Sequence, residues 1–146
     1  MLKGDGVLGA YDLALHQYGP EKIIGSIHIE VDDKLTAKDI HKLTRKISED
    51  VFRKYGVVLT IGIYASNTDK SESAKIKQEV GRMIKKYETI SQMHGFYADL
   101  EYKTVTFDLV FDFDEKNSEQ IVSEISKKLE EKHPDYSFDI IVDLLY

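Results

Sequence analysis

The stretch of sequence that decides the fold runs from residue 9 to residue 33 and reads GAYDLALHQYGPEKIIGSIHIEVDD. Apolar and polar side chains alternate on both sides of a Gly19-Pro20 turn, which is typical of two β-strands, because successive strand side chains point to opposite faces. Gly tolerates the positive φ of a tight turn, and Pro cannot continue a central strand. The stretch therefore predicts an antiparallel hairpin with one solvated face.

The solvated face of this hairpin carries the first candidate site residues. The alternation places Asp12 and His16 on the polar side of the first strand and His28 on the polar side of the second. The apolar side of the first strand is predicted to consist of Tyr11, Leu13 and Leu15. Two imidazoles and a carboxylate are common metal ligands. A cluster of Asp12, His16 and His28 is therefore one hypothesis, and it depends on the strand register.

The segment after the hairpin completes a first structural unit. Thr36 and Asp39 form a capping pattern before apolar residues at helical spacing, which predicts a helix over about 36–54. Gly56 ends this helix, and β-branched residues over 57–64 predict a third strand. A polar loop at 66–69 and a connecting helix over about 71–87 follow.

The same order of elements then begins again. A second hairpin is predicted over 96–102 and 104–113, with a tight turn around Lys103. A helix starting at Asn117 or Ser118 stops before Pro134 and is followed by a last strand. The predicted fold class is therefore α+β, with two ferredoxin-like or metallochaperone-like units. The predicted boundaries are 1–66 for the first unit, 67–88 for the connecting helix and 89–146 for the second unit.

Composition limits the possible functions. The 146 residues are 42% hydrophobic and 32% charged, which suits one modest core or two small ones. The formal charge of -6 disfavours binding to nucleic acid phosphates. Without cysteine, a metal site must use imidazole, carboxylate, carbonyl or water. We find no nucleophile elbow, phosphate-binding glycine loop or zinc-protease motif, so an enzyme is not expected.

Residues 5–65 resemble the cytoplasmic C-terminal domain of cation diffusion facilitator transporters. The typical opening of that family has Gly-Val or Gly-Ala followed by His-Asp-Leu, and this chain reads Gly9-Ala10-Tyr11-Asp12-Leu13. The resemblance implies that His28 corresponds to the second-strand histidine of the family and His41 to a helix histidine. The candidate metal ligands are therefore His28, His16, Asp12 and His41.

The resemblance also implies that the usual metal site of the family is incomplete here. Tyr11 replaces a metal-binding histidine, and Gly62 and Tyr64 stand where many members carry a His-x-Asp pair. Weak or absent metal binding is therefore expected at this site. The second unit carries Asp108 in place of His28, so it is expected to be structural or regulatory. His94 is expected to lie in a loop before Gly95, with no metal role.

The resemblance implies a soluble cytoplasmic regulatory and dimerisation domain of a divalent metal cation efflux transporter, with Mn, Fe, Zn or Co as its ion. The expected partners are a second copy of the chain and the membrane domain of the same transporter, which would place the full-length protein in the cell membrane. One alternative is an ACT-like small-molecule sensor, although a hairpin here precedes the helix in both units. Another is a soluble metal chaperone, for which a ligand set without cysteine is hard to assemble.

Overall fold

The computed structural model describes residues 6–67 and 72–144. The chain divides into two compact units, Met1–Thr68 and Asp69–Tyr146, here called unit 1 and unit 2. Each unit contains one three-stranded sheet. This confirms the predicted α+β class, with two ferredoxin-like units that each combine a hairpin, a helix and a third strand. Residues 68 and 69 of the predicted polar loop lie outside the described residues.

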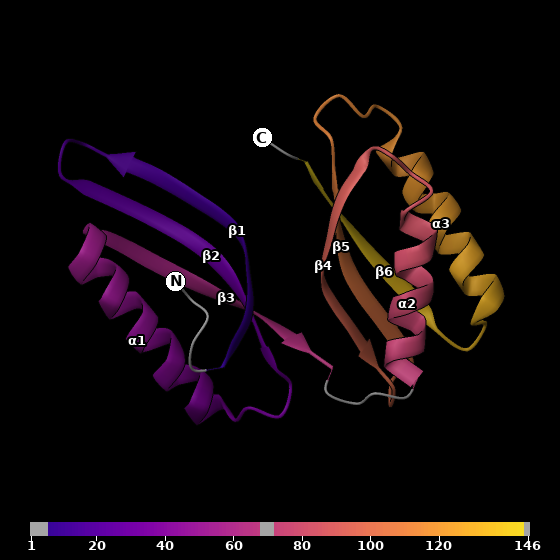
Figure 1. The fold of residues 1–146 in the computed structure, drawn as a ribbon, viewed down its shortest axis with the longest axis horizontal. Helices are drawn as coiled ribbons and strands as arrows, with labels where there is room; N and C mark the ends of the chain where they lie inside the picture. The colour runs from indigo at the N-terminus through magenta and orange to yellow at the C-terminus, as the bar shows by residue number, and fades with distance from the viewer. Residues whose placement is uncertain (1–5, 68–71, 145–146) are drawn as a thin grey trace. The chain divides into compact units, whose positions relative to one another are not determined.

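Unit 1 consists of β1 (Val7–Tyr18), β2 (Lys22–Asp32), α1 (Ala37–Tyr55) and β3 (Val57–Ser66). The central strand β2 pairs antiparallel with β1 and parallel with β3. The helix α1 lies along one face of this sheet (Figure 1). The opposite side of the sheet is called the helix-free face of unit 1.

The ends of α1 are set by its caps, as the sequence predicts. The Thr36 side chain accepts a hydrogen bond from the Asp39 backbone, and the Asp39 side chain accepts one from the Thr36 backbone. Gly56 ends the helix in the left-handed conformation, at φ 69°. The buried centre of the unit 1 core is small and consists of Ile29, Val31 and Ile47.

Unit 2 consists of α2 (Glu72–Ile84), β4 (Ile90–Asp99), β5 (Thr104–Phe111), α3 (Ser118–Lys132) and β6 (Ser137–Leu144). The central strand β5 pairs antiparallel with β4 and parallel with β6, as β2 does with its neighbours in unit 1. Figure 1 shows α2 and α3 on the same side of this sheet. The predicted connecting helix thus packs against β4 and α3. The opposite side is the helix-free face of unit 2.

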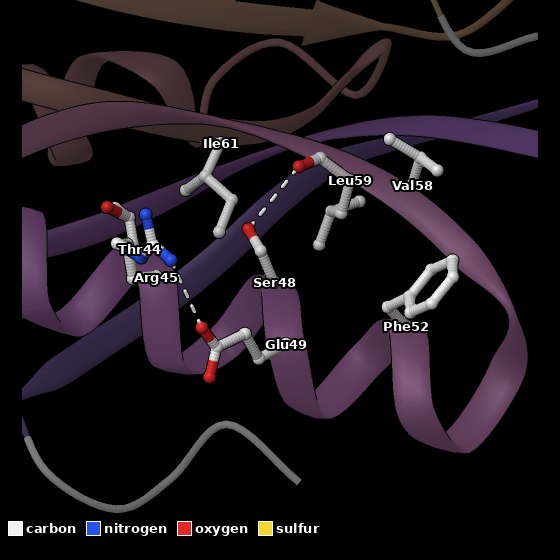
Figure 2. A pocket seen from close by; sticks show the side chains of 8 residues that line it. All are labelled: Thr44, Arg45, Ser48, Glu49, Phe52, Val58, Leu59 and Ile61. Carbon is white, nitrogen blue, oxygen red and sulfur yellow. Dashed lines mark hydrogen bonds and ion pairs between the residues drawn. The ribbon is translucent and has the colours of Figure 1, made fainter.

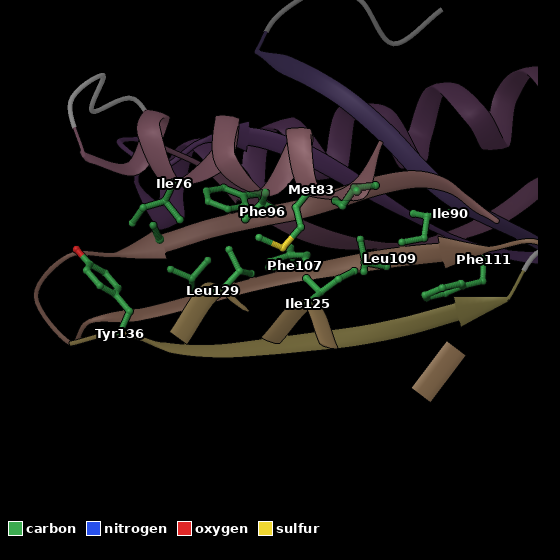
Figure 3. Close-up of a cluster of buried hydrophobic side chains, with 14 residues drawn as sticks. Ile76, Met83, Ile90, Phe96, Phe107, Leu109, Phe111, Ile125, Leu129 and Tyr136 are labelled. Atoms are coloured by element: carbon green, nitrogen blue, oxygen red, sulfur yellow. The ribbon is translucent and has the colours of Figure 1, made fainter. Parts of the chain in front are cut away.

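The core of unit 2 is much larger than that of unit 1. Figure 3 shows the inward side chains of β4 and β5 meeting those of α2 and α3. Its aromatic members supply much of the buried apolar area. The buried residues are Ile76, Val80, Met83, Ile84, Ile90, Phe96, Ala98, Val105, Phe107, Leu109, Phe111, Ile125, Leu129 and Tyr136.

The second hairpin differs from its predicted bounds. The strand β4 begins at Ile90 rather than at Phe96, because Ile90 is buried in the core and pairs with Phe111. As a result, His94 lies within a strand and not in a loop. The strand β5 ends at Phe111, so Phe113, the last residue of the predicted strand, lies beyond it and is 77% exposed.

Both hairpins are interrupted at matching places. In unit 1, Tyr11 pairs with His28 and Ala14 pairs with Ser26, so the two residues between them on β1 face one residue on β2. The first of the two, Asp12, has a φ of 59°. This is a β-bulge, and Asp tolerates the left-handed conformation better than most residues do.

The bulge of unit 2 has the same register. His94 pairs with Asp108 and Tyr97 pairs with Thr106, and the residue after His94 is Gly95, with a φ of 65°. A further register shift occurs near the start of both β1 and β4. The two hairpins therefore share a pattern of irregularities as well as an order of strands.

The bulge of unit 1 overturns one sequence prediction. Tyr11 was assigned to the apolar side, but it lies opposite His28 and bonds to Glu30 on the helix-free face. The inserted residue breaks the strict alternation of side chains on which the assignment rested. Leu13 and Leu15, assigned to the same apolar side, are 61% and 55% exposed.

Candidate metal sites on the two helix-free faces

The helix-free face of unit 1 brings together Asp12, His28 and Tyr64 from three strands. Asp12 Oδ2 lies 3.4 Å from His28 Nδ1 and accepts a hydrogen bond of 3.2 Å from the Tyr64 hydroxyl. The bulge makes this possible, because it turns Asp12 toward the side where Tyr11 and His28 are paired. Asp12 therefore joins its two neighbours through a single carboxylate oxygen.

The imidazole of His28 is also held by its neighbours on β3. It stacks on the Tyr64 ring at a centroid distance of 4.6 Å and an interplanar angle of 15°. It also lies across Gly62, which pairs with His28 in the sheet. A Cβ atom added to Gly62 would lie 2.5 Å from His28 Nε2, so only glycine leaves room for this ring position.

Tyr11 is bonded on the same face and is poorly suited to bind a metal ion. Its hydroxyl donates a hydrogen bond of 3.0 Å to Glu30 Oε2. Burial, followed by this bond and the nearby Glu30 charge, raises the pKa of the Tyr11 phenol above its usual value. Metal ligands must lose their protons, so a raised pKa opposes coordination by Tyr11.

His16 and His41 lie elsewhere in unit 1. The register pairs His16 with Ile24, four residues along β2 from His28, so it shares the helix-free face without joining the group of Asp12 and His28. His41 is exposed on α1, which covers the other side of the sheet. Of the four predicted ligands, the structure brings together Asp12 and His28.

The helix-free face of unit 2 carries a different group, formed by His94, Asp108 and Asp143. His94 Nε2 lies 3.8 Å from Asp108 Oδ2 and 3.6 Å from Asp143 Oδ2. One ligand atom from each residue can be chosen so that all lie within 4.8 Å of one another. His94 and Asp108 are buried, and Asp143 is half-buried. These three residues could hold a metal ion.

The sequence alone does not predict this group. Its patterns predict a loop at His94 and no metal-ligand set in the second unit, because they do not indicate that β4 starts at Ile90. One signal for the group is present in the sequence. Asp108 occupies the position in the second hairpin that His28 occupies in the first. Asp143 follows from the parallel pairing of β5 with β6, which sets it opposite Val110 and two residues from Asp108.

A groove on the helix-covered side of unit 1 is the other notable surface feature. Figure 2 shows its apolar wall, with Phe52 from α1 beside Val58, Leu59 and Ile61 from β3. Arg45 and Glu49 pair across its polar rim at 3.4 Å. Phe52 is 56% exposed, so α1 leaves apolar surface uncovered beside the edge strand β3.

The comparison with known proteins found one similarity, and it lies in unit 1. Residues 1–63 match the family described as cation efflux protein, cytoplasmic domain. Unit 1 is similar to this domain over nearly its whole length. The match covers both strands of the first hairpin, α1 and most of β3. A search of curated proteins found no match. Among residues 6–67 and 72–144, no helix is long and apolar enough to cross a membrane.

Proposed function

We propose that this chain is a regulatory and dimerisation module of a divalent metal cation efflux transporter, joined to a membrane domain of the same transporter and lying on the cytoplasmic side of the cell membrane. In this proposal unit 1 forms the homodimer contact, and unit 2 is a diverged copy of unit 1. The family match over residues 1–63 supports the transporter context. The shared register of the two hairpins supports the duplication.

The observation that carries the dimer proposal is the uneven distribution of exposed apolar side chains. Most of the large exposed ones among the described residues lie in unit 1, and the remainder are Tyr102, Phe113 and Ile141 of unit 2. Exposed apolar surface marks an interaction site where it is contiguous. The residues of unit 1 concerned are Leu8, Leu13, Leu15, Tyr18, Phe52, Tyr55, Val58 and Ile63.

Unit 1 is expected to bind divalent metal weakly. Its helix-free face offers His28 and Asp12, but the positions around them carry Tyr11, Gly62 and Tyr64. The His28 ring already stacks on Tyr64 and lies beside Asp12. A metal ion would have to displace these contacts and would gain few ligands in return.

Sedimentation equilibrium of the full chain without metal tests the dimer proposal. We expect a dimer, and we expect Leu13→Lys combined with Leu15→Lys to make it a monomer, because both leucines are more than half exposed on β1. Tyr102→Lys is the matched control, since Tyr102 is 75% exposed in unit 2. A wild-type chain that stays monomeric at all concentrations, or a leucine variant that stays dimeric, contradicts the assignment.

A further inference from the structure

We propose that unit 2 binds one divalent cation through His94, Asp108 and Asp143. Cation binding by these three residues of unit 2 does not depend on the proposed transporter context. Regulation of a dimer by the bound cation, in contrast, rests on the proposed function. The site would then lie outside residues 1–63, the part of the chain that matches the family.

The spacing of the three side chains suits ligands around one ion. His94 Nε2 is 3.8 Å from the Asp108 carboxylate and 3.6 Å from the Asp143 carboxylate. Two ligands that bind an ion at about 2.1 Å and at a tetrahedral angle lie roughly 3.4 Å apart. Small side-chain rotations would therefore bring all three groups to bonding distance.

The backbone holds these ligands on adjacent strands. His94 lies directly opposite Asp108, and the residues flanking Asp108 on β5, Phe107 and Leu109, are fully buried in the core. Their burial on the helix-covered side fixes Asp108 on the other side, because strand side chains alternate. Ligands on paired strands are held more precisely than ligands on loops.

The charge and the donor types indicate the class of ion. With a neutral imidazole, His94, Asp108 and Asp143 carry a formal charge of about -2, which a divalent cation neutralises. Carboxylates suit Mn²⁺, and imidazole suits Fe²⁺ and Zn²⁺, so one imidazole with two carboxylates favours Mn²⁺, Fe²⁺, Co²⁺ or Zn²⁺. Three protein ligands also leave coordination positions for water.

The matching register positions of unit 1 lack this donor set. The counterparts of His94 and Asp108 are Tyr11 and His28, which are also a directly opposed pair before the bulge. The counterpart of Asp143 is Tyr64, since each lies opposite the residue two places further along the central strand. Of these three counterparts in unit 1, His28 is the common metal ligand.

Calorimetric titration of the full chain with Mn²⁺ and with Zn²⁺ tests the site. We expect one ion per chain for at least one of the two metals. Asp108→Asn and Asp143→Asn keep the side-chain shape, and each is expected to weaken binding at least about tenfold, because even the loss of an outer-shell partner costs 10–100-fold. Thermal unfolding of each variant checks that the fold is kept.

Two control variants test whether metal binding depends on these three residues. One tests the general effect of removing a negative charge, and the other tests the histidine of unit 1. Asp139→Asn removes the same charge from the same strand and sheet face, since Asp139 and Asp143 are four residues apart on β6. His28→Gln removes the imidazole of unit 1. Both are expected to bind the metal within about twofold of the wild type, because neither residue is a proposed ligand.

Paramagnetic broadening of amide signals by Mn²⁺ locates the bound ion. We expect the strongest broadening around residues 94, 108 and 143. Broadening centred on His28, unchanged affinity in both aspartate variants, or no binding of either metal up to millimolar concentration overturns the proposal. The dimer measurement is made without metal. A failed dimer therefore leaves the metal site standing, and a failed titration leaves the dimer standing.

Discussion

Unit 1 and unit 2 share a backbone pattern and differ in what they place on it. Both have a central strand with an antiparallel and a parallel neighbour, and both hairpins are bulged after the same paired position. Unit 1 carries a histidine stacked on a tyrosine on its helix-free face, whereas unit 2 carries a histidine between two carboxylates. Register therefore fixes which residues meet, and a few substitutions decide the chemistry of the face.

The two bulges show how one backbone feature serves two purposes. In unit 1 the left-handed position is held by Asp12, whose carboxylate contacts His28 and Tyr64. In unit 2 the same position is held by Gly95, which has no side chain. The carboxylates of unit 2 come instead from regular strand positions, Asp108 and Asp143.

The largest effect on stability is expected from a large-to-small substitution in the core of unit 2. This substitution tests whether the two units have separate cores. Phe107 is fully buried, so Phe107→Ala should destabilise unit 2 by about 3–5 kcal/mol. The chain has no tryptophan, so we would follow amide NMR signals of each unit during urea unfolding. Tyr102→Ala, at a 75% exposed position, should change stability by less than about 0.5 kcal/mol. Simultaneous loss of the unit 1 signals would show that the two units unfold together and would contradict separate cores.

Smaller changes in stability, of opposite sign, are expected when one glycine in each unit is replaced by alanine. Gly62→Ala places a Cβ against the His28 ring and should cost about 1–3 kcal/mol, because the ring must leave Tyr64. Gly81→Ala lies within α2 with no atom within 4 Å of the new Cβ, and should stabilise by about 0.5–1 kcal/mol. Urea unfolding measures both, and an unchanged stability of Gly62→Ala with the stack intact would be inconsistent with the close packing.

The smallest effect concerns two tyrosines that donate to glutamates, one in each unit. Burial and then the bond to Glu30 raise the pKa of Tyr11, and burial and then the bond to Glu72 raise the pKa of Tyr136, against a lowering contribution from Lys103. A raised pKa adds stability that is present below the usual tyrosine pKa of about 10 and is lost as the pH rises through the folded value.

Urea unfolding at a series of alkaline pH values measures this loss. Tyr11→Phe and Tyr136→Phe should each reduce the steepness with which stability of the corresponding unit falls above about pH 10. The two variants also report on different units. If Tyr11→Phe shows the same pH dependence as the wild type, the pKa of the Tyr11 phenol is not raised in the folded unit.

Local sequence signals predicted most of the fold. The capping pattern at Thr36 and Asp39, the glycine at Gly56 and the turn at Gly19 each have a local physical cause, and each gave the right boundary. The start of β4 was missed because the residues from Ile90 to His94 show no clear alternation, and their strand is fixed by pairing with β5. Pairing is a tertiary effect that local propensity does not report.

The candidate sites were harder to predict than the fold because they depend on register. Asp12 and His28 were both named from the sequence, but the bulge that joins them could not be read from alternation. The group of His94, Asp108 and Asp143 needs three strands in the correct alignment. A shift of one residue in any of them would send a ligand to the other face.

The contiguity of unit 1 also has a consequence for how the protein is made. All strands of unit 1 lie within Met1–Thr68, so its sheet can close before unit 2 has been synthesised. At ribosomal rates of about 5–20 residues per second, the residues of unit 2 take roughly 4–16 s to be added. During that interval unit 1 can already expose the leucines of β1, so the proposed contact between two copies does not have to wait for unit 2.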